Sequence, residues 1–154
     1  MPEHRDVSPT NIHEPKGAYS ASSGTVYVAD GAGSGSFTAI NNLNKITLTY
    51  TFTDVSTASS QWVVCPIAGT ISKIYSVLHG AIATANTVMS FEIAGIAVTN
   101  GNITLTHSGS AAGDIDSSTP TAVRTLTAGQ AIEIISDGGS TNTVNATITF
   151  VINV

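Results

Sequence analysis

Two aspartates at close spacing are the first candidate for metal chemistry. Asp114 and Asp116 lie in the segment Gly113–Ser118, GDIDSS. Oxygen ligands at positions i and i+2 can bind Ca²⁺, but an EF-hand loop also needs Asp or Asn at its fifth position, glycine at the sixth and glutamate at the twelfth. Those residues are missing from this segment. We therefore interpret it as a solvated loop.

The four histidines form no ligand spacing on one element. They are His4, His13, His79 and His107, and the last two fall at the ends of expected strands. In a trimer, one residue repeated three times around an axis could bind a metal ion or an anion. An ordinary polar residue at a strand end is the simpler interpretation, so the sequence predicts no metal site.

Paired carboxylates for glycoside hydrolysis are the next possibility. Glu92 and Glu133 are the only glutamates beyond the N-terminal segment. Each stands among apolar neighbours in an expected strand, which indicates an outward-facing position. A glycosidase site would need both side chains to face one cleft, and nothing in the sequence brings them together.

Nucleophilic catalysis and phosphate binding also lack their motifs. Gly33-Ser34-Gly35 is too short for a nucleophile elbow. The glycine-rich loop 31–36 has neither a Gly-Lys-Ser/Thr ending nor a helix pattern after it. Cys65 is the single cysteine, so no intramolecular disulfide can form, and its apolar neighbours predict a buried small hydrophobe. The sequence predicts a non-enzymatic protein without catalytic residues, cofactor or metal.

The composition favours β-sheet surfaces that meet other protein. The chain has 154 residues, of which 42% are hydrophobic and only 10% are charged, whereas average chains are about a quarter charged. Charge is depleted at the cores of protein interfaces. The net charge of −5 and the absence of a basic cluster disfavour partners such as nucleic acid or a membrane surface.

The first residues lack the apolar run of a signal peptide. No apolar run approaches the length of a membrane span. We therefore expect the chain to fold in the cytoplasm of the cell that makes it.

Three segments are expected along the chain. Residues 1–24 are polar and rich in proline, which predicts an extended arm. Residues 25–44 predict a short β-hairpin and a hinge, and residues 45–154 predict a β-sandwich. The arm is too poor in apolar area to fold alone. It either stays loose or is held by a partner surface. We expect the second, with Ile12, His13, Pro15 and Tyr19 as the anchors.

The third segment is all-β. Apolar residues alternate with threonines over 45–53, as in a half-buried strand. Asn100-Gly101 predicts a tight hairpin between 96–99 and 102–107. About eight or nine strands are spaced as in a sandwich, and eight is the number of a jelly roll. The prediction is a jelly-roll-like antiparallel sandwich, with a Greek-key sandwich of another strand order as the alternative.

The strand over 70–79 carries apolar residues on both faces. A second sheet would cover one face, and a neighbouring subunit is expected to cover the other. The sequence thus predicts a subunit interface that includes Ile74, Tyr75, Val77 and Leu78.

Several segments of the sequence resemble a known class of virion proteins. Asn11–Ala18 and Gly24–Phe37 resemble the N-terminal region of head-fibre and capsid-decoration (cement) proteins of tailed bacteriophages. Cys65–Val77, Gly109–Asp114 and the final strand 146–154 resemble the β-domain of the same proteins. The resemblance implies a trimeric knob on the outer capsid surface of the virion. It also implies that the arm grips the major capsid protein and so stabilises the shell.

Two other functions stay open at this point. One is an adhesion knob of a tail fibre or head fibre that binds a host-surface glycan through the loops 108–120 and 137–142. Those loops contain no aromatic residue that could stack on a sugar. The other is a bacterial surface β-domain, which would need a secretion signal that this sequence lacks.

Overall fold

The computed structural model describes residues 21–32, 35–39 and 44–154. The chain divides into two compact units, Met1–Leu43 and Asn44–Val154. Residues 1–20 of the predicted arm 1–24 lie outside the described residues. All four predicted anchors belong to this part of the arm.

The first unit contains one antiparallel hairpin, in which β1 (Thr25–Ala29) pairs with β2 (Gly35–Ala39). Tyr27 lies directly opposite Phe37, and their rings meet edge to face with centroids 5.3 Å apart. This aromatic pair gives the hairpin a small apolar side of its own. A hairpin alone is at best marginally stable in water.

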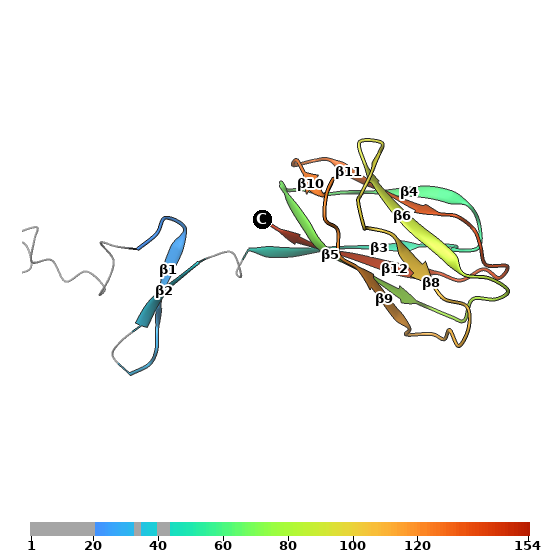
Figure 1. Cartoon of the computed structure of the whole chain (residues 1–154), viewed down its shortest axis with the longest axis horizontal. Coiled ribbons are helices and arrows are strands. Elements are labelled where there is room, and N and C mark those ends of the chain that lie inside the picture. Colours follow the sequence, from blue (N-terminus) through green and yellow to red (C-terminus); the bar gives the residue numbers. More distant parts are fainter. Residues whose placement is uncertain (1–20, 33–34, 40–43) are drawn as a thin grey trace, which may run out of the picture. The chain divides into compact units, whose positions relative to one another are not determined.

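The second unit is a sandwich of two five-stranded sheets (Figure 1). Its strands are β3 (Lys45–Phe52), β4 (Ser59–Val64), β5 (Gly69–Leu78), β6 (Thr87–Ile93), β7 (Ile96–Ala97), β8 (Ile103–Leu105), β9 (Ile115–Ser118), β10 (Thr125–Leu126), β11 (Ala131–Ser136) and β12 (Ala146–Asn153). The β5 sheet has the order β10-β5-β12-β3, and β9 also pairs with β5. The β11 sheet has the order β4-β11-β6-β7, and β8 also pairs with β6.

This pairing is the strand order of an eight-stranded jelly roll. One sheet contains β3-β12-β5-β9, the other contains β4-β11-β6-β8, and every pair is antiparallel. The two-residue strands β7 and β10 are additions at the margins. The predicted all-β, jelly-roll-like sandwich is therefore confirmed, and the pairing supplies the strand order that a single sequence does not contain.

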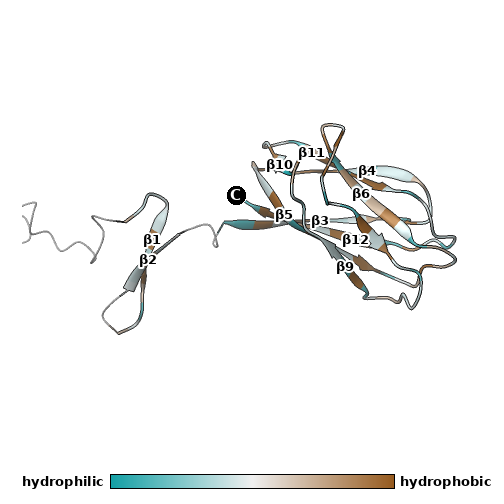
Figure 2. Cartoon of the chain, viewed as in Figure 1, coloured by the Kyte–Doolittle hydropathy of each residue, from teal (hydrophilic) through white to brown (hydrophobic). Residues whose placement is uncertain are grey.

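The core lies between the two sheets. Buried and half-buried residues alternate strictly along β6 and β12, and Figure 2 shows the same alternation as brown and pale bands along the strands. Phe91 from one sheet meets Phe150 from the other edge to face, with ring centroids 5.3 Å apart. Both rings are fully buried, so this contact joins the two layers at the centre of the core.

A β-bulge changes which residues of the strand β5 face the core. The pairing of β5 with β12 shifts by one residue at Ser72. The extra residue brings both Ile71 and Ile74 to the core side, although strict alternation placed them on opposite faces. The outer face keeps Lys73, Tyr75 and Val77.

The burial of β5 residues corrects the predicted subunit interface. Ile74 and Leu78 are fully buried inside their own chain, so neither side chain is free to contact another subunit. Tyr75 is 39% exposed, and Val77 is half-buried on the outer face. Only these last two of the four predicted residues are accessible to a partner.

The expected hairpin turn is in a different place. Ala94 and Gly95 join β6 to β7 and have φ values of 53° and 75°. Positive φ at both central residues is the mark of a tight primed turn. Asn100 also has a positive φ, but Gly101 does not, and β8 pairs with β6 rather than with β7. The prediction of a hairpin at Asn100-Gly101 was wrong.

Candidate functional site

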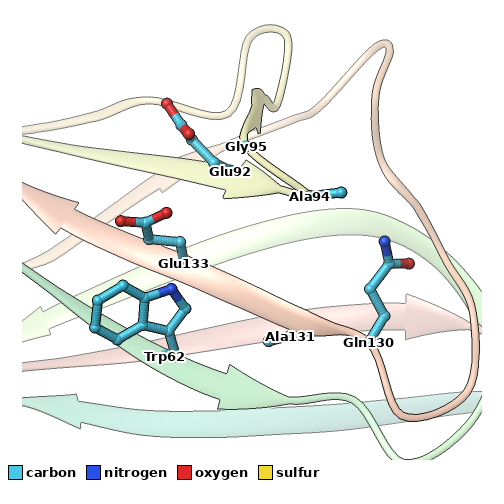
Figure 3. A pocket seen from close by; sticks show the side chains of 7 residues that line it. All are labelled: Trp62, Glu92, Ala94, Gly95, Gln130, Ala131 and Glu133. Atoms are coloured by element: carbon cyan, nitrogen blue, oxygen red, sulfur yellow. The ribbon is translucent and has the colours of Figure 1, made fainter.

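A shallow hollow of about 180 Å³ opens on the outer face of the β11 sheet. Trp62, Glu92 and Glu133 form one side and Gln130 the other (Figure 3). The hollow is also lined by small residues from the β6–β7 turn and from the start of β11, namely Ala94, Gly95 and Ala131. We call this feature the Trp62 hollow.

Three neighbouring strands place the main side chains of the Trp62 hollow in one row. Trp62 on β4 pairs with Glu133 on β11, and Glu133 pairs with Glu92 on β6. Residues directly opposite each other on antiparallel strands have Cβ atoms about 4.5–5.5 Å apart. The indole and the two carboxylates therefore stand next to one another on the surface, as Figure 3 shows.

Trp62 is unusually accessible for a tryptophan. It is the only tryptophan of the chain, it lies on the edge strand β4, and it is 57% exposed. A large aromatic side chain contributes most when it is buried against a partner. An indole left open beside a hollow is therefore a candidate contact for a ligand.

The two carboxylates of the hollow have no basic partner among the described residues. Arg124 donates to the backbone oxygen of Pro120. Lys73, which lies on the β5 sheet, donates to the hydroxyl of Thr119. Like charges that face each other across strands are destabilising. Glu92 and Glu133 thus form an uncompensated negative site on this face.

The hollow does not have the form of a glycosidase site. The sequence predicted Glu92 and Glu133 to face outward, and both lie half-buried on the outer face. Glycosidase carboxylates flank the scissile bond, with an acid and a base in different environments. Here both carboxylates lie on the same side of the Trp62 hollow, next to each other on paired strands, so they do not flank a bound substrate. The arrangement suits binding rather than bond cleavage.

The outer face of the β5 sheet has a different chemistry. The edge strand β3 and its neighbour β12 carry rows of threonines, which are Thr47, Thr49, Thr51, Thr147 and Thr149. The hydroxyl oxygens of Thr49 and Thr149 lie 3.3 Å apart, and His79 Nε2 lies 2.7 Å from the hydroxyl of Thr147. Lys45 and Lys73 are the only charged residues at the outward positions of its described strands. This face is polar but almost free of charge.

An apolar patch adjoins the threonine rows. Ile115 on β9 is 67% exposed and lies directly opposite Val77 on β5. Tyr75 is the next outward residue of β5 and is 39% exposed. We call Tyr75, Val77 and Ile115 the β5–β9 patch. The two predicted interface residues that remain accessible are thus joined by a third, which sequence reasoning had assigned to a loop.

The aspartates considered for Ca²⁺ do not converge on a metal. Asp114 accepts a hydrogen bond of 2.7 Å from the backbone N–H of Ala111. Asp116 lies within the strand β9 and pairs with Ser76, whose buried hydroxyl has no partner in the described part of the chain. Burial and the negative charge of Asp114 raise the pKa of Asp116 above its ordinary value. No group of three or more His, Cys, Asp or Glu residues that could hold a metal ion occurs within the described ranges.

We expect Asp116→Asn to stabilise the domain at neutral pH. A carboxyl with a raised pKa binds its proton more tightly in the folded state, so its charged form costs stability above that pKa. The advantage of the variant should shrink as the pH falls below the ordinary pKa of aspartate. Urea unfolding of both proteins between pH 3 and pH 7 measures this, and equal stability at every pH would contradict it.

The other candidate residues lie apart from the hollow. His107 Nδ1 lies 3.0 Å from the side-chain oxygen of Asn86, and His79 belongs to the threonine face. The segment 108–120, considered for glycan binding, contains β9. The loop 137–142 is tied to the domain by the Asn142 amide, which donates to the backbone oxygen of Ala81.

Sequence reasoning missed the Trp62 hollow. Alternation around Trp62 and Glu133 gives each an outward position, but only the pairing of β4, β11 and β6 brings them together.

The geometry defines a jelly-roll domain with a small surface hollow and a separate face that is almost free of charge. No protein-family model matches the sequence, and comparison with curated proteins finds no significant match. Among the described residues there is no helix that is long and apolar enough to cross a membrane.

The solved structures that are similar to this one include two viral proteins. The first is a chain from the acidic stable capsid structure of Helicobacter pylori bacteriophage KHP30, with 15% identity, 71% of this chain and 87% of that chain covered, and a TM-score of 0.48. The second is the P-domain of Macrobrachium rosenbergii nodavirus, with 10% identity, 71% and 92% coverage, and a TM-score of 0.29. At TM-scores below 0.5, neither neighbour carries an argument about function.

Proposed function

We propose that this protein is a non-enzymatic structural protein of a tailed-phage virion, which decorates and stabilises the outer capsid surface as a homotrimer. The observation that carries the proposal is the outer face of the β5 sheet, where threonine rows and the β5–β9 patch form a surface almost without charge. Such a surface has the composition of an interface core. The sequence resemblance to head-fibre and cement proteins points to the same role.

The charges of the two sheet faces favour the β5 sheet as the trimer interface. Packing subunits through the other face would bury Glu92 and Glu133, and desolvating an unpaired carboxylate costs several kcal/mol. The β5 face would bury hydroxyls that already bond to one another and the apolar side chains of the β5–β9 patch. Val77 and Tyr75 of the predicted interface belong to this face.

Attachment to the shell is assigned to the N-terminal arm. Ile12, His13, Pro15 and Tyr19 are its proposed contacts with the major capsid protein. Three arms in one trimer bind with avidity, so that weak single contacts add up to a stable attachment. A trimer that bridges neighbouring capsid subunits opposes their separation. The proposed location is therefore the outer capsid surface of the virion.

Adhesion to a host-surface glycan is the second candidate function. One observation favours it, because Trp62 supplies the exposed aromatic side chain that the loops 108–120 and 137–142 lack. The knob would then bind its glycan on the β11 sheet rather than through those loops. Glycan binding that is lost in Trp62→Ala, with capsid attachment unchanged, would support this function.

Deletion of residues 1–24 tests the decoration role. We expect the shortened protein to remain a folded trimer and to lose its attachment to capsids that lack the native protein, because the arm supplies the contacts. Co-sedimentation with such capsids measures attachment, and circular dichroism with light scattering checks the fold and the mass. If the shortened protein still decorates capsids at full occupancy, the role of the arm is wrong.

A further inference from the structure

We propose that the Trp62 hollow binds a guanidinium or ammonium group, in the form of an arginine or lysine side chain presented by a partner protein. The proposal concerns the outer face of the β11 sheet. It does not depend on the capsid role, which is assigned to the arm and the β5 face.

The indole of Trp62 provides the first part of the site. Tryptophan is the strongest aromatic partner for a cation, which it attracts through the negative face of its ring. With 57% of its surface exposed on an edge strand, Trp62 is open to a group that arrives from solvent. A planar guanidinium can also stack on an aromatic face, whereas a neutral amide gains no cation–π attraction.

The paired carboxylates provide the second part. Glu133 is directly opposite Trp62, and Glu92 is directly opposite Glu133. A positive group held over this row is attracted by both carboxylates and relieves their mutual repulsion. Arginine can also bond to a carboxylate through two parallel N–H donors. The lack of a basic partner within the described residues leaves this charge to a ligand.

The size of the hollow limits what it can hold. Its volume of about 180 Å³ is below the roughly 300–1,000 Å³ of pockets for drug-sized ligands. Ala94, Gly95 and Ala131 contribute almost no side-chain bulk. On the far side, the side-chain oxygen Oε1 of Gln130 accepts a hydrogen bond of 2.9 Å from the backbone N–H of Thr127, which holds the Gln130 side chain in place. The space suits the end of one side chain.

Charge complementarity selects a basic group over a neutral sugar. A sugar ring could stack on Trp62 and donate hydroxyls to the carboxylates, but it would leave both negative charges uncompensated. A basic side chain satisfies the indole and the carboxylates together. The net charge of −5 of the whole chain further favours a cationic partner.

The single tryptophan makes a direct test possible. The intact protein is titrated with the blocked peptide acetyl-Gly-Arg-Gly-amide while the fluorescence of Trp62 is followed. The control peptide contains citrulline, which keeps the shape of arginine and lacks its charge. We expect a saturable change with the arginine peptide that weakens as salt is added, and a much weaker response to the citrulline peptide.

Matched variants assign the effect to the hollow. We expect Glu92→Gln and Glu133→Gln each to weaken the binding of the arginine peptide roughly tenfold, because each substitution removes one charge-assisted contact. Asp116→Asn removes the same charge from the other sheet and should bind like the native protein. Thermal unfolding of each variant checks that the fold is intact.

Several results would overturn the proposal. They are equal binding of the arginine and citrulline peptides, native affinity in both glutamine variants, or no response to the arginine peptide. A saturable response to methyl glucoside without one to the arginine peptide would assign the hollow to a sugar instead. None of these results changes the expected attachment to capsids, so this proposal and the proposed function fail separately.

Discussion

Phe150→Ala should lower the free energy of unfolding by about 3–5 kcal/mol, the usual cost of removing a fully buried phenylalanine. Phe150 has no exposed surface and meets Phe91 from the opposite sheet. Its strand, β12, lies between β3 and β5, so the surrounding backbone is held on both sides. The cavity left by the ring would have little freedom to collapse, and much of the lost contact would not be recovered.

Urea unfolding followed by far-ultraviolet circular dichroism measures this loss. Thr149→Ala is the matched control, because Thr149 is the preceding residue of the same strand and faces outward. We expect the control to change the free energy of unfolding by less than about 1 kcal/mol. Equal losses in the two variants would contradict the placement of the core between the sheets.

Val77→Asp should convert the proposed trimer into monomers. Val77 lies opposite Ile115 in the β5–β9 patch, so an interface on this face would bury the new carboxylate. The face offers Lys73 as a possible counter-charge, but Lys73 already contacts Thr119 and the ring of Tyr75. A buried unpaired charge costs several kcal/mol, and each 1.4 kcal/mol weakens association tenfold. We therefore expect association at least about 100-fold weaker.

Light scattering coupled to size-exclusion chromatography measures the mass in solution. We expect three times the chain mass for the native protein and the mass of one chain for Val77→Asp. Thr104→Asp is the control, because Thr104 is exposed on β8 in the other sheet, and it should stay trimeric. A monomeric native protein would remove the assembly proposal. A trimeric Val77→Asp variant would move the interface to another face.

The strand β5 shows what the sequence could and could not predict. The residue types of this segment predict a strand, and its apolar content predicts burial. Which residues face the core depends on a one-residue shift in pairing at Ser72. That shift arises between β5 and β12, which are far apart in the sequence, so no local pattern reveals it. The shift brings Ile71 to the face that already holds Ile74 and Leu78. The expectation that Ile74 and Leu78 contact a neighbouring subunit failed because the packing of the two sheets, and no local pattern, decides which face of a strand is the core face.

The turn between β6 and β7 shows a second limit. Asn-Gly is a strong local signal for a primed turn, yet the chain forms its tight turn at Ala94 and Gly95. Tertiary pairing overrode the local preference, because β8 pairs with β6 and leaves Asn100-Gly101 in a connection. The turn that forms also brings Ala94 and Gly95 to the Trp62 hollow.

The sequence by itself determined the all-β class, the number of main strands and the low content of charged residues. These properties follow from composition and from alternation with a period of two, which are local. Only the tertiary structure decided the jelly-roll order, the faces of β5 and the row of Trp62, Glu133 and Glu92. Cross-strand neighbours are set by pairing between distant segments, and that pairing depends on how all the strands pack around one core.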